Sequence, residues 1–529
     1  MMTKKLSEIL NNIRAYFQNN LLTFVILAVV FVVSYGFELF NMHLSIDEEL
    51  SSLRPSGNLS LISNGRWGQF LLSTIFVNKL TVPFLPLALS LVSHLASMLI
   101  LFACFNIEKQ PDRTVLAGIS MTWPGLCFVY SLSTINFAVG LGFFCISLIL
   151  LILIKANKFW KFLATFPIAL IIGTYQPLLV PLLMVCILFL IYRWKEEYHY
   201  AFSFLSYTVL VLGLGFFLSF LIQQIFLFMN HTRSTGYALH YFLISGVFQN
   251  LTWYLQKLAR LAYNIFVGDS SFYGVAIRSL PIFLLFAGIL ILVTHYQNRT
   301  KNGNFILFLG LLGIFSILPF IGGVLTKGYI PYRSLLGVPI FLMGWAALAL
   351  KYASPKAKIV LGVLAVFTLF QFALSTNHLF ASSAFAYEED KLLAYQLVDR
   401  IEDEKAKAPS ENLQYIELIG YVDRPSTPLV SRIENIGASF FGWDQGNTSR
   451  VVNFLRVLGY SAPDALPVEK RAEFVSPGIQ MPVWPAFGSV QIIGNTILVK
   501  FSPYSETQIK DICEYEGDYS LPDHFCPKD

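Results

Sequence analysis

The sequence predicts a polytopic α-helical membrane protein with a C-terminal extracytoplasmic α/β domain. Of its 529 residues, 55% are hydrophobic and only 13% are charged, whereas about 25% of the residues in a soluble domain are charged. The apolar residues fall into repeated blocks of about 18 to 25 residues, the length of a membrane-spanning helix. After Ser375 the composition turns polar. The first two observations exclude a single soluble globule, and the third predicts a domain outside the membrane.

Hydropathy predicts about eleven spans within a transmembrane body over residues 1–376. Two longer loops, 41–80 and 230–278, are expected on the outer side. An interruption at 174–177 leaves two interpretations open, either two short spans or one long kinked helix over 162–192. The predicted spans are 21–40, 82–105, 114–132, 135–155, 162–175, 177–192, 201–229, 279–295, 305–325, 335–350 and 359–375.

The positions of Lys and Arg predict the sidedness. Loops on the N-terminal side are short and dense in cations, and loops on the other side are longer and carry fewer. The positive-inside rule therefore places the N-terminus in the cytoplasm, and an odd number of spans places the C-terminal domain outside. The formal net charge of +5 reflects topology, and no nucleic-acid partner is expected because no basic face forms. The cations expected inside are Lys4, Lys5, Arg14, Lys109, Arg113, Lys155, Lys158, Lys161, Arg193, Lys195, Arg299, Lys301, Lys351, Lys356 and Lys358.

Residues 377–529 have the mixed patterning of a small α/β domain. We expect an amphipathic helix at 387–401, a strand at 414–420, a helix at 449–459 and a hairpin at 489–501 that turns at Gly494-Asn495.

The six cysteines divide between the body and the terminal domain. Four lie in apolar spans, and Cys513 and Cys526 lie in the terminal domain. The pair is compatible with a disulfide in an oxidising compartment, and two reduced thiols are the alternative. No cysteine or histidine spacing indicates zinc.

No nucleotide-binding motif is evident. The pairs Gly140/Gly142 and Gly213/Gly215 lie inside apolar spans, where close helix packing explains them better than a phosphate loop.

The first outer loop contains an acidic triplet, Asp47-Glu48-Glu49. An acid at the outer surface beside a lipid-linked substrate can act as general base on an acceptor hydroxyl. Burial and neighbouring acids would raise its pKa, and Arg54 or Arg66 would lower it. A solvated loop or an acidic helix N-terminus is the alternative.

Arg66 precedes a predicted interfacial helix at 69–77, with Trp67 at headgroup level. A guanidinium suits bidentate phosphate binding, and the alternative is a simple anchor.

The last outer loop, 326–334, places two cations and two tyrosines in a short connection: Lys327, Tyr329, Tyr332 and Arg333. Such a group can clamp a lipid phosphate as it leaves, although tyrosines and cations are also ordinary residues of the membrane interface.

Three further features have both a functional and a structural interpretation. Tyr175 and Gln176, at the break in 162–192, can contact a sugar or simply form a turn. His94 is alone in its span and is expected to pack or hydrogen-bond rather than to bind a ligand. The stretch 254–266, with Lys257 and Arg260 on one face, can be an interfacial helix or part of an acceptor groove.

An acid in the first outer loop, followed by Gly65-Arg66-Trp67 and an interfacial helix, resembles the bacterial O-antigen-modifying glucosyltransferases that convert serotype. The runs 481–485, 488–490 and 497–500 are similar to the end of that family. The resemblance extends over the whole architecture of body, first outer loop and terminal domain.

This resemblance implies a GT-C-like fold and an enzyme of the bacterial inner membrane with a periplasmic terminal domain. Its donor would be a sugar, usually glucose, on undecaprenyl phosphate, and its acceptor the O-antigen or another surface polysaccharide. Transfer would invert the anomeric centre without a nucleotide or cofactor at the site, with a divalent metal ion left open.

The resemblance also assigns residues. Asp47 is the first-choice base and Glu48 the second, with the choice among the three acids open and Glu49 otherwise a substrate contact. Arg66 and Arg333, with Lys327, are candidates for the donor phosphate. The proposed substrate contacts are Tyr175, Gln176, Tyr329, Tyr332 and Lys500, the last matching a terminal lysine.

Two rivals are a transporter or flippase of lipid-linked sugar and another GT-C enzyme that acts on protein or on a different glycan. A coupled transporter usually has acids near the bilayer midplane and paired repeats, and the sequence has neither.

Overall fold

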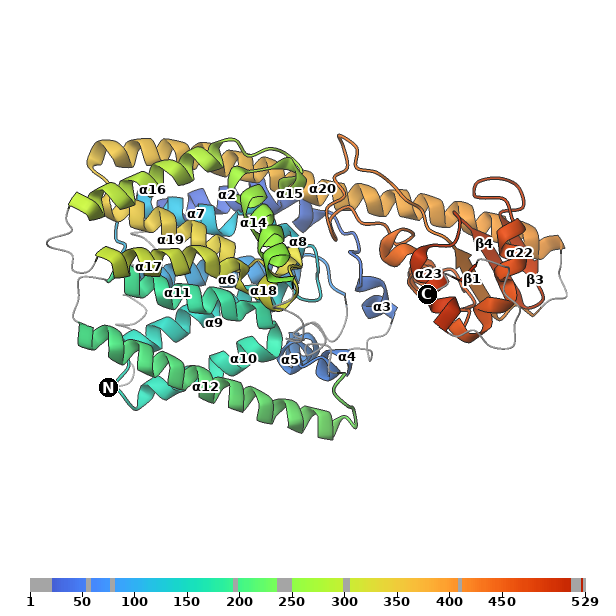
Figure 1. Ribbon diagram of the computed structural model, residues 1–529, viewed down its shortest axis with the longest axis horizontal. Coiled ribbons are helices and arrows are strands. Elements are labelled where there is room, and N and C mark those ends of the chain that lie inside the picture. The colour runs from blue at the N-terminus through green and yellow to red at the C-terminus, as the bar shows by residue number, and fades with distance from the viewer. Residues whose placement is uncertain are drawn as a thin grey trace. The chain divides into compact units, whose positions relative to one another are not determined.

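The chain divides into two compact units. The computed structural model describes residues 21–53, 59–76, 81–193, 198–235, 250–297, 305–407, 412–514 and 525–526 (Figure 1). Unit 1 comprises Met1–Met42 and Asn58–Phe380, and unit 2 comprises His43–Gly57 and Ala381–Asp529. Unit 2 therefore includes a segment of the first predicted outer loop, which lies more than 300 residues before the rest of that unit along the chain.

Unit 1 is a bundle of apolar helices. Within the described residues, seven helices are long and apolar enough to cross a membrane, among them α2, α6, α9, α12, α16 and α20. This agrees with a polytopic membrane protein, whereas the predicted total of eleven spans is not confirmed. The elements are α2 (Leu21–Phe40), α4 (Leu59–Ser63), α5 (Trp67–Phe76), α6 (Leu85–Phe105), α7 (Gln110–Met121), η2 (Pro124–Leu126), α8 (Cys127–Tyr130), α9 (Asn136–Lys155), η3 (Trp160–Ala164), α10 (Thr165–Thr174), η4 (Gln176–Leu178), α11 (Leu179–Tyr192), α12 (Tyr198–Met229), α14 (Leu251–Val267), α15 (Ser270–Tyr273), α16 (Ser279–Gln297), α17 (Phe305–Ile317), η6 (Leu318–Phe320), α18 (Ile321–Leu325), η7 (Tyr332–Ser334), α19 (Gly337–Tyr352) and α20 (Pro355–Lys407).

One predicted span differs in the structure, and the choice left open at 162–192 is decided in favour of two helices. The range 114–132 is not one helix, because α7 ends at Met121 and the chain turns through Trp123 and Pro124 before α8. Proline disfavours helical backbone in the residue before it, which explains the break. The range 162–192 is two helices, α10 and α11, separated by Tyr175 in extended conformation with φ of −151°.

Helix α19 is apolar because it is surrounded by protein. It packs against α7, α11 and α16, and most of its side chains are buried. With 16 residues it is shorter than the roughly 20 residues that span a bilayer. A helix that is apolar all round is expected in such a buried position.

Helix α20 continues without a break from the apolar range 359–375 into unit 2, over 53 residues. We predicted a span and a separate amphipathic helix at 387–401, and both belong to this single helix. No Pro or Gly occurs from 363 to 407, so no residue in that stretch stops the helix.

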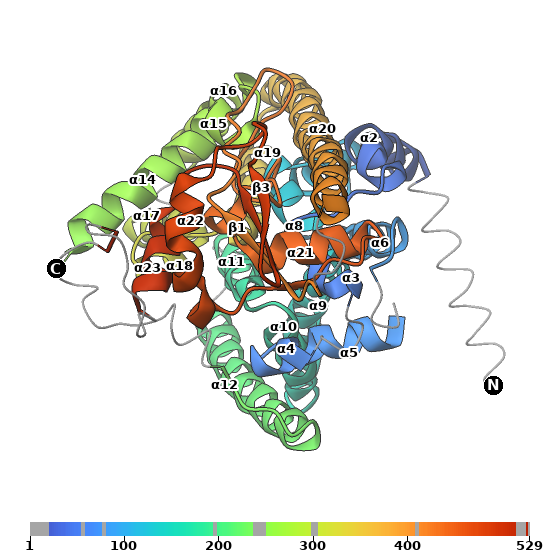
Figure 2. The ribbon, with the colours of Figure 1, turned by 90° about the vertical axis from the view of Figure 1, so that its right-hand side faces the viewer.

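Unit 2 is built on a four-stranded mixed sheet in the order β2-β1-β4-β3 (Figure 2). Strand β1 pairs in parallel with β2 and β4, and β3 pairs antiparallel with β4. The β3–β4 pair confirms the predicted hairpin. The elements are α3 (Glu48–Leu53), β1 (Tyr415–Ile419), η8 (Trp443–Gln445), α21 (Thr448–Val457), β2 (Asp464–Ala465), η9 (Val468–Phe474), α22 (Val475–Gln480), β3 (Val490–Ile493), β4 (Thr496–Lys500) and α23 (Glu506–Glu514).

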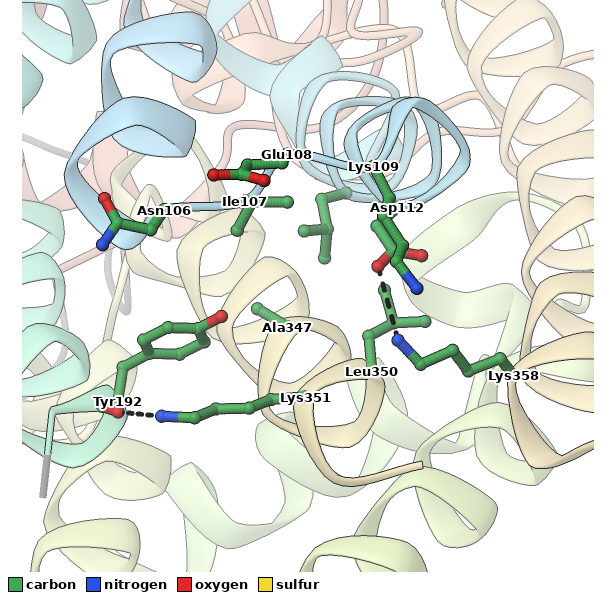
Figure 3. A pocket seen from close by; sticks show the side chains of 11 residues that line it. Asn106, Ile107, Glu108, Lys109, Asp112, Tyr192, Ala347, Leu350, Lys351 and Lys358 are labelled. Carbon is green, nitrogen blue, oxygen red and sulfur yellow. Dashed lines mark hydrogen bonds and ion pairs between the residues drawn. The ribbon is translucent and has the colours of Figure 1, made fainter. Parts of the chain in front are cut away.

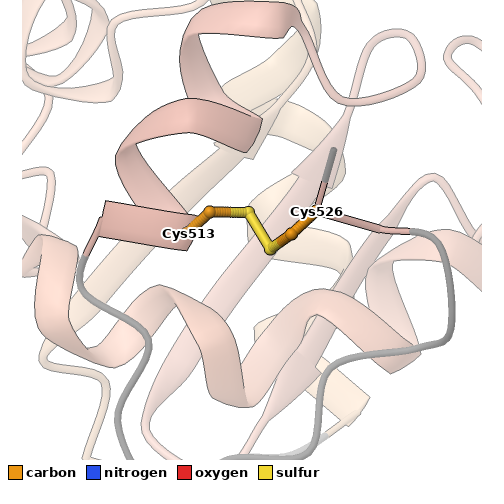
Figure 4. Close-up of a disulfide and its surroundings, with 2 residues drawn as sticks. All are labelled: Cys513 and Cys526. Atoms are coloured by element: carbon orange, nitrogen blue, oxygen red, sulfur yellow. A yellow bond between two sulfur atoms is a disulfide. The ribbon is translucent and has the colours of Figure 1, made fainter. Parts of the chain in front are cut away.

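Cys513, near the end of α23, forms a disulfide with Cys526 (Figure 4). Their Cα atoms are 5.9 Å apart. The other four cysteines are buried in unit 1.

Glycines in the apolar helices allow close packing at three of the four predicted positions. A Cβ on Gly140 would lie 2.4 Å from the backbone of Ser90 in α6, and one on Gly142 would lie 2.3 Å from Leu178. A Cβ on Gly215 would lie 2.3 Å from Ile168. Gly213 has open space around it, so the prediction is wrong there.

Candidate active site

The acidic segment of the first predicted outer loop is anchored in the core of unit 2. Leu44 and Ile46 are 6% and 2% exposed and belong to the same core cluster as Phe454 and Leu455 of α21. Helix α3 packs against α21, as Figure 2 shows. These apolar residues precede the acids directly, so the core of unit 2 fixes the backbone on which the acids stand.

Glu48 begins α3 and has a local structural contact. Its Oε2 accepts a hydrogen bond from the backbone N–H of Ser45 at 3.0 Å. A glutamate that reaches back three residues to a backbone N–H is one half of a capping box. Only 1% of Glu48 is exposed, which keeps its carboxylate from bulk solvent.

Arg450, near the start of α21, holds three carboxylates. Its Nη1 lies 2.8 Å from Glu49 Oε1, and its Nη2 lies 3.0 Å from Asp47 Oδ1 and 3.0 Å from Asp444 Oδ2. The fork of the guanidinium suits such multiple pairing. Asp47 and Glu49, in the first predicted outer loop, are therefore oriented by a residue about 400 positions later in the chain.

Glu49 is the buried member of this group. Its side chain is 5% exposed, and its Oε2 has no hydrogen-bond partner within the part of the chain that is described. Burial raises the pKa of Glu49, although the nearby Arg450 charge lowers it. Desolvation thus outweighs the ion pair at this carboxyl.

Asp47 is the accessible member. Its side chain is 55% exposed while one oxygen contacts Arg450. Its backbone has φ of 78°, a conformation that is uncommon outside glycine and that Asn and Asp tolerate best. Residues held in such conformations cluster at functional sites. Of the three acids in the triplet, Asp47 best combines exposure with fixed geometry.

The sequence analysis did not identify Arg450. One signal for it exists, because Arg450 lies in the first turn of α21, where the helix dipole favours acids over cations. A cation in that position indicates carboxylates nearby, but the sequence does not say which ones.

In unit 1, two glycines bring α5 and α10 into close contact. A Cβ on Gly173 would lie 2.2 Å from the Trp67 ring, and one on Gly68 would lie 2.8 Å from Thr174. Trp67 is buried, stacks on Phe226, and donates to Ser219 Oγ at 3.1 Å. The Trp67 ring therefore fills the crossing of the helices, and its position at headgroup level stays a prediction.

This crossing brings together residues from three predicted elements. The guanidinium of Arg66 lies over the ring of Tyr175, with Cζ 5.6 Å from the ring centroid. Gln176 Nε2 donates to the carbonyl of Gly65 at 3.4 Å, and the Tyr175 hydroxyl donates to the carbonyl of Arg333 at 3.3 Å. The structure thus brings the Arg66 guanidinium, Tyr175, Gln176 and the backbone of Arg333 into one cluster.

Arg66 is a partly exposed cation in this cluster. No carboxylate in the described ranges lies within ion-pair distance of its guanidinium. A cation over an aromatic face and without an acidic partner can accept a phosphate.

The other residues of the last predicted outer loop, 326–334, differ in their surroundings. Tyr332 packs against Phe128 and Phe272, with ring centroids 5.1 Å and 4.8 Å away. Lys327 and Tyr329 are exposed. Tyr332 therefore fixes the loop, and the exposed pair can reach a ligand.

Lys500 is used inside unit 2. Its Nζ donates to the carbonyls of Ile479 and Met481, both at 2.8 Å. It is only 7% exposed, and burial lowers its pKa. We leave Lys500 out of the substrate site for this reason.

The prediction for His94 agrees with the structure, and the stretch 254–266 is helical, which leaves both of its interpretations open. His94 is buried, stacks on Phe143 and lies 3.1 Å from the Tyr130 hydroxyl. The stretch 254–266 lies within α14, where Lys257 packs over the Trp253 ring at 3.5 Å.

No group of three or more His, Cys, Asp or Glu side chains suited to a metal ion occurs in the described part of the chain. Arg54, which we considered as a neighbour of the acids, lies outside the described residues.

Comparison with known protein families identifies the family of this chain. The family model for glucosyl transferase GtrII matches residues 36–350, which include the acidic triplet, Arg66 and Arg333. A search of the curated proteins finds no match to the chain.

Proposed function

Since the chain belongs to the GtrII glucosyl transferase family, we propose that it transfers a glucosyl residue from a polyprenyl phosphate, undecaprenyl phosphate in bacteria, to a surface glycan such as the O-antigen. The enzyme is a glycosyltransferase with a helical membrane body. The proposed reaction occurs on the periplasmic side of the inner membrane. The cationic inner loops and the disulfide in unit 2 support this sidedness.

In the proposed step, the carboxylate of Asp47 accepts the proton of the acceptor hydroxyl. The oxygen attacks the anomeric carbon, and the bond from that carbon to the phosphate oxygen breaks with its electron pair leaving on the polyprenyl phosphate. A single displacement inverts the anomeric centre. Positive charge develops on the sugar and negative charge on the phosphate, so cations stabilise the leaving group.

The observation that carries this proposal is the arrangement around Arg450. It holds the exposed Asp47 in a fixed orientation through the same guanidinium that pairs with the buried Glu49. A general base must be both accessible and oriented. Glu48, which is 1% exposed and bound to the Ser45 N–H, suits helix initiation better.

We assign Arg66 and Arg333 to the donor phosphate, with Lys327 as an accessible cation of the same loop. Their support is the cluster through Tyr175 and the lack of an acidic partner for Arg66 within the described residues. Tyr175 and Gln176 then shape the sugar end of the donor site, and Tyr329 contributes an exposed ring.

The test of the proposed base compares Asp47→Asn with Asp444→Asn. The two aspartates contact the same nitrogen of Arg450 at 3.0 Å, both have positive φ, and both are about half exposed. Asparagine tolerates this backbone conformation, so neither change strains the chain. We expect Asp47→Asn to reduce transfer from lipid-linked glucose to purified glycan by about 10²- to 10⁴-fold, and Asp444→Asn to change it only slightly.

Equal activity of both variants would remove Asp47 as the base. The next candidate would then be Glu49, tested by Glu49→Gln in the same assay. If transfer survives in Asp47→Asn, Glu48→Gln and Glu49→Gln alike, the mechanism with a first-loop carboxylate is wrong.

A further inference from the structure

A polar cavity of about 220 Å³ lies in unit 1, away from the residues assigned above. It is bordered by the loop after α6, the start of α7, the end of α11, the end of α19 and the start of α20. Figure 3 shows Lys351 and Lys358 entering this space, and the Tyr192 ring directed into it. Its charged lining residues are Lys109, Lys351, Lys358, Glu108 and Asp112.

Among the described residues, the charged side chains that line this cavity are net positive. Lys358 Nζ pairs with Asp112 Oδ2 at 3.6 Å. Lys351 donates to the Tyr192 carbonyl and lies over the Tyr192 ring, 4.1 Å from its centroid. Three lysines against two carboxylates give one excess positive charge in the described part of the lining. A ligand with a negatively charged group complements this part of the lining.

An apolar groove lies beside the cavity. It encloses about 600 Å³ and is lined almost wholly by apolar atoms. The lining residues come from α2, α7 and α20, and are Leu22, Thr23, Ile26, Gln110, Pro111, Thr114, Val115, Ile359, Gly362, Val363, Val366 and Phe367.

The first turns of α7 and α20 border both spaces. Asp112 and Lys358 line the cavity, and their sequence neighbours Pro111 and Ile359 line the groove. A charged chamber thus adjoins an apolar channel across the Lys358–Asp112 ion pair. The two together have the chemistry of an amphiphile with one charged end and one long apolar chain.

We propose that this pair of spaces binds an anionic phospholipid, with the phosphate in the cavity near Lys109 and Lys351 and an acyl chain in the groove. Basic pockets between membrane helices on the cytoplasmic side commonly receive lipid head groups. The lysines involved are among the cations that the positive-inside rule places on the cytoplasmic side. The bound lipid therefore comes from the inner leaflet, and this site is separate from the proposed sugar-transfer site.

Binding of the lipid phosphate in the cavity is tested on purified, delipidated full-length protein in detergent. Phosphatidylglycerol, phosphatidylcholine with the same acyl chains, and inorganic phosphate are compared by native mass spectrometry and thermal shift. We expect retention of phosphatidylglycerol. The double variant Lys109→Gln/Lys351→Gln should weaken it about tenfold, because two partly exposed ion pairs are lost.

Lys356→Gln is the matched control, because Lys356 is an exposed lysine of α20 outside the cavity. It should leave binding unchanged. Equal binding of phosphatidylcholine would overturn the proposal, as would an equal thermal shift by inorganic phosphate alone or an equal loss in the control.

Binding of the acyl chain in the groove is tested separately. A Cβ on Gly362 meets no atom within 4 Å, so Gly362→Trp fills the groove without displacing protein. We expect it to reduce phosphatidylglycerol binding, while Gly362→Ala keeps most of it. Gly310→Trp, at another open position on α17, is the control for adding an exposed indole.

Full binding by Gly362→Trp would overturn the assignment of the groove to the acyl chain. A change of oligomeric state in Gly362→Trp, with phosphatidylglycerol binding unaltered, would show that a second copy of the chain occupies the groove instead.

Discussion

At the scale of single residues, one guanidinium organises the acids of unit 2. Arg450 is 10% exposed and pairs with three carboxylates, of which Glu49 is buried and Asp47 and Asp444 are about half exposed. Removing one partner of a buried pair leaves the other charge without compensation, which costs more than the pair itself contributes. Arg450 is therefore expected to matter for both the stability and the chemistry of the enzyme.

Arg450→Met should lower the unfolding free energy of unit 2 by about 3 kcal/mol, since Glu49 then stays buried without a cation. Hydrogen exchange of unit 2 peptides, followed by mass spectrometry, measures this change. Arg456→Met is the control on the same helix, because Arg456 pairs with Asp464, which is 77% exposed. Such surface pairs contribute less than about 1 kcal/mol to the free energy of unfolding. Equal losses of unfolding free energy in Arg450→Met and Arg456→Met would refute the prediction.

The buried carboxyl of Glu417 leads us to predict that the stability of unit 2 depends on pH. Glu417 is buried on β1, 3.2 Å from Arg471 Nε, and accepts from Thr448 Oγ1. Burial raises the pKa of Glu417 to about 7, although Arg471 and Thr448 lower it. The folded state thus holds a proton that the unfolded state releases, and the stability from this group is lost as pH rises from about 4.5 to about 7.

The measurement is the unfolding free energy of unit 2 between pH 5 and pH 8 for the native chain and for Glu417→Gln. The amide does not titrate, so the variant should lose less stability over this range. A native chain whose pH dependence matches that of the variant would show that Glu417 does not titrate there.

At the scale of elements, small residues decide which helices touch. Gly173 and Gly68 let α10 and α5 cross around Trp67, and this crossing places Arg66 over Tyr175. Gly140 similarly allows α9 to approach the α6 backbone at Ser90. Gly213, in α12, has open space and no such role.

The two kinds of glycine should respond in opposite ways to the same change. Gly140→Ala forces α9 away from α6 and should lower the melting temperature in detergent. Gly213→Ala should leave it unchanged or raise it, since alanine favours a helix interior by up to about 1 kcal/mol. A loss of stability in Gly213→Ala equal to that in Gly140→Ala would contradict this assignment.

At the scale of the whole molecule, unit 2 is assembled from two distant parts of the chain. The family match ends at residue 350, yet the acids within the matched range are held by residues after 380. The terminal domain is thus part of what orients the proposed base. Changes in its core should reduce activity even where they touch no substrate.

Ile46→Ala tests this dependence. Ile46 is 2% exposed in the core of unit 2, and truncating a buried isoleucine to alanine costs about 2 to 5 kcal/mol. We expect faster proteolysis of unit 2 and loss of transfer, with the helical unit intact. Leu50→Ala, on the same segment but 42% exposed, should have little effect, and equal sensitivity of both variants would count against the anchoring role.

The sequence alone predicted the features that depend on local pattern. Apolar block length predicted the membrane helices, alternation and an Asn-containing turn predicted the β3–β4 hairpin, and two cysteines outside the spans suggested the disulfide. Each of these signals is contained in a short stretch of chain. The break at Pro124 was not predicted, because a hydropathy window averages over a short interruption of a helix. The continuity of α20 was not predicted either, because the apolar window ends where the sequence turns polar, whereas the helix continues past that point.

Only the tertiary structure decided which distant side chains meet. It paired Asp47 and Glu49 with Arg450. It placed Arg66 over the Tyr175 ring, whose hydroxyl donates to the Arg333 carbonyl. The Lys500 ammonium donates hydrogen bonds to two backbone carbonyls inside unit 2. The sequence predicted that acids and cations lie in the loops on one side of a membrane body. It could not determine their partners, because a pairing across hundreds of residues depends on how the apolar cores pack, and many packings share the same local pattern.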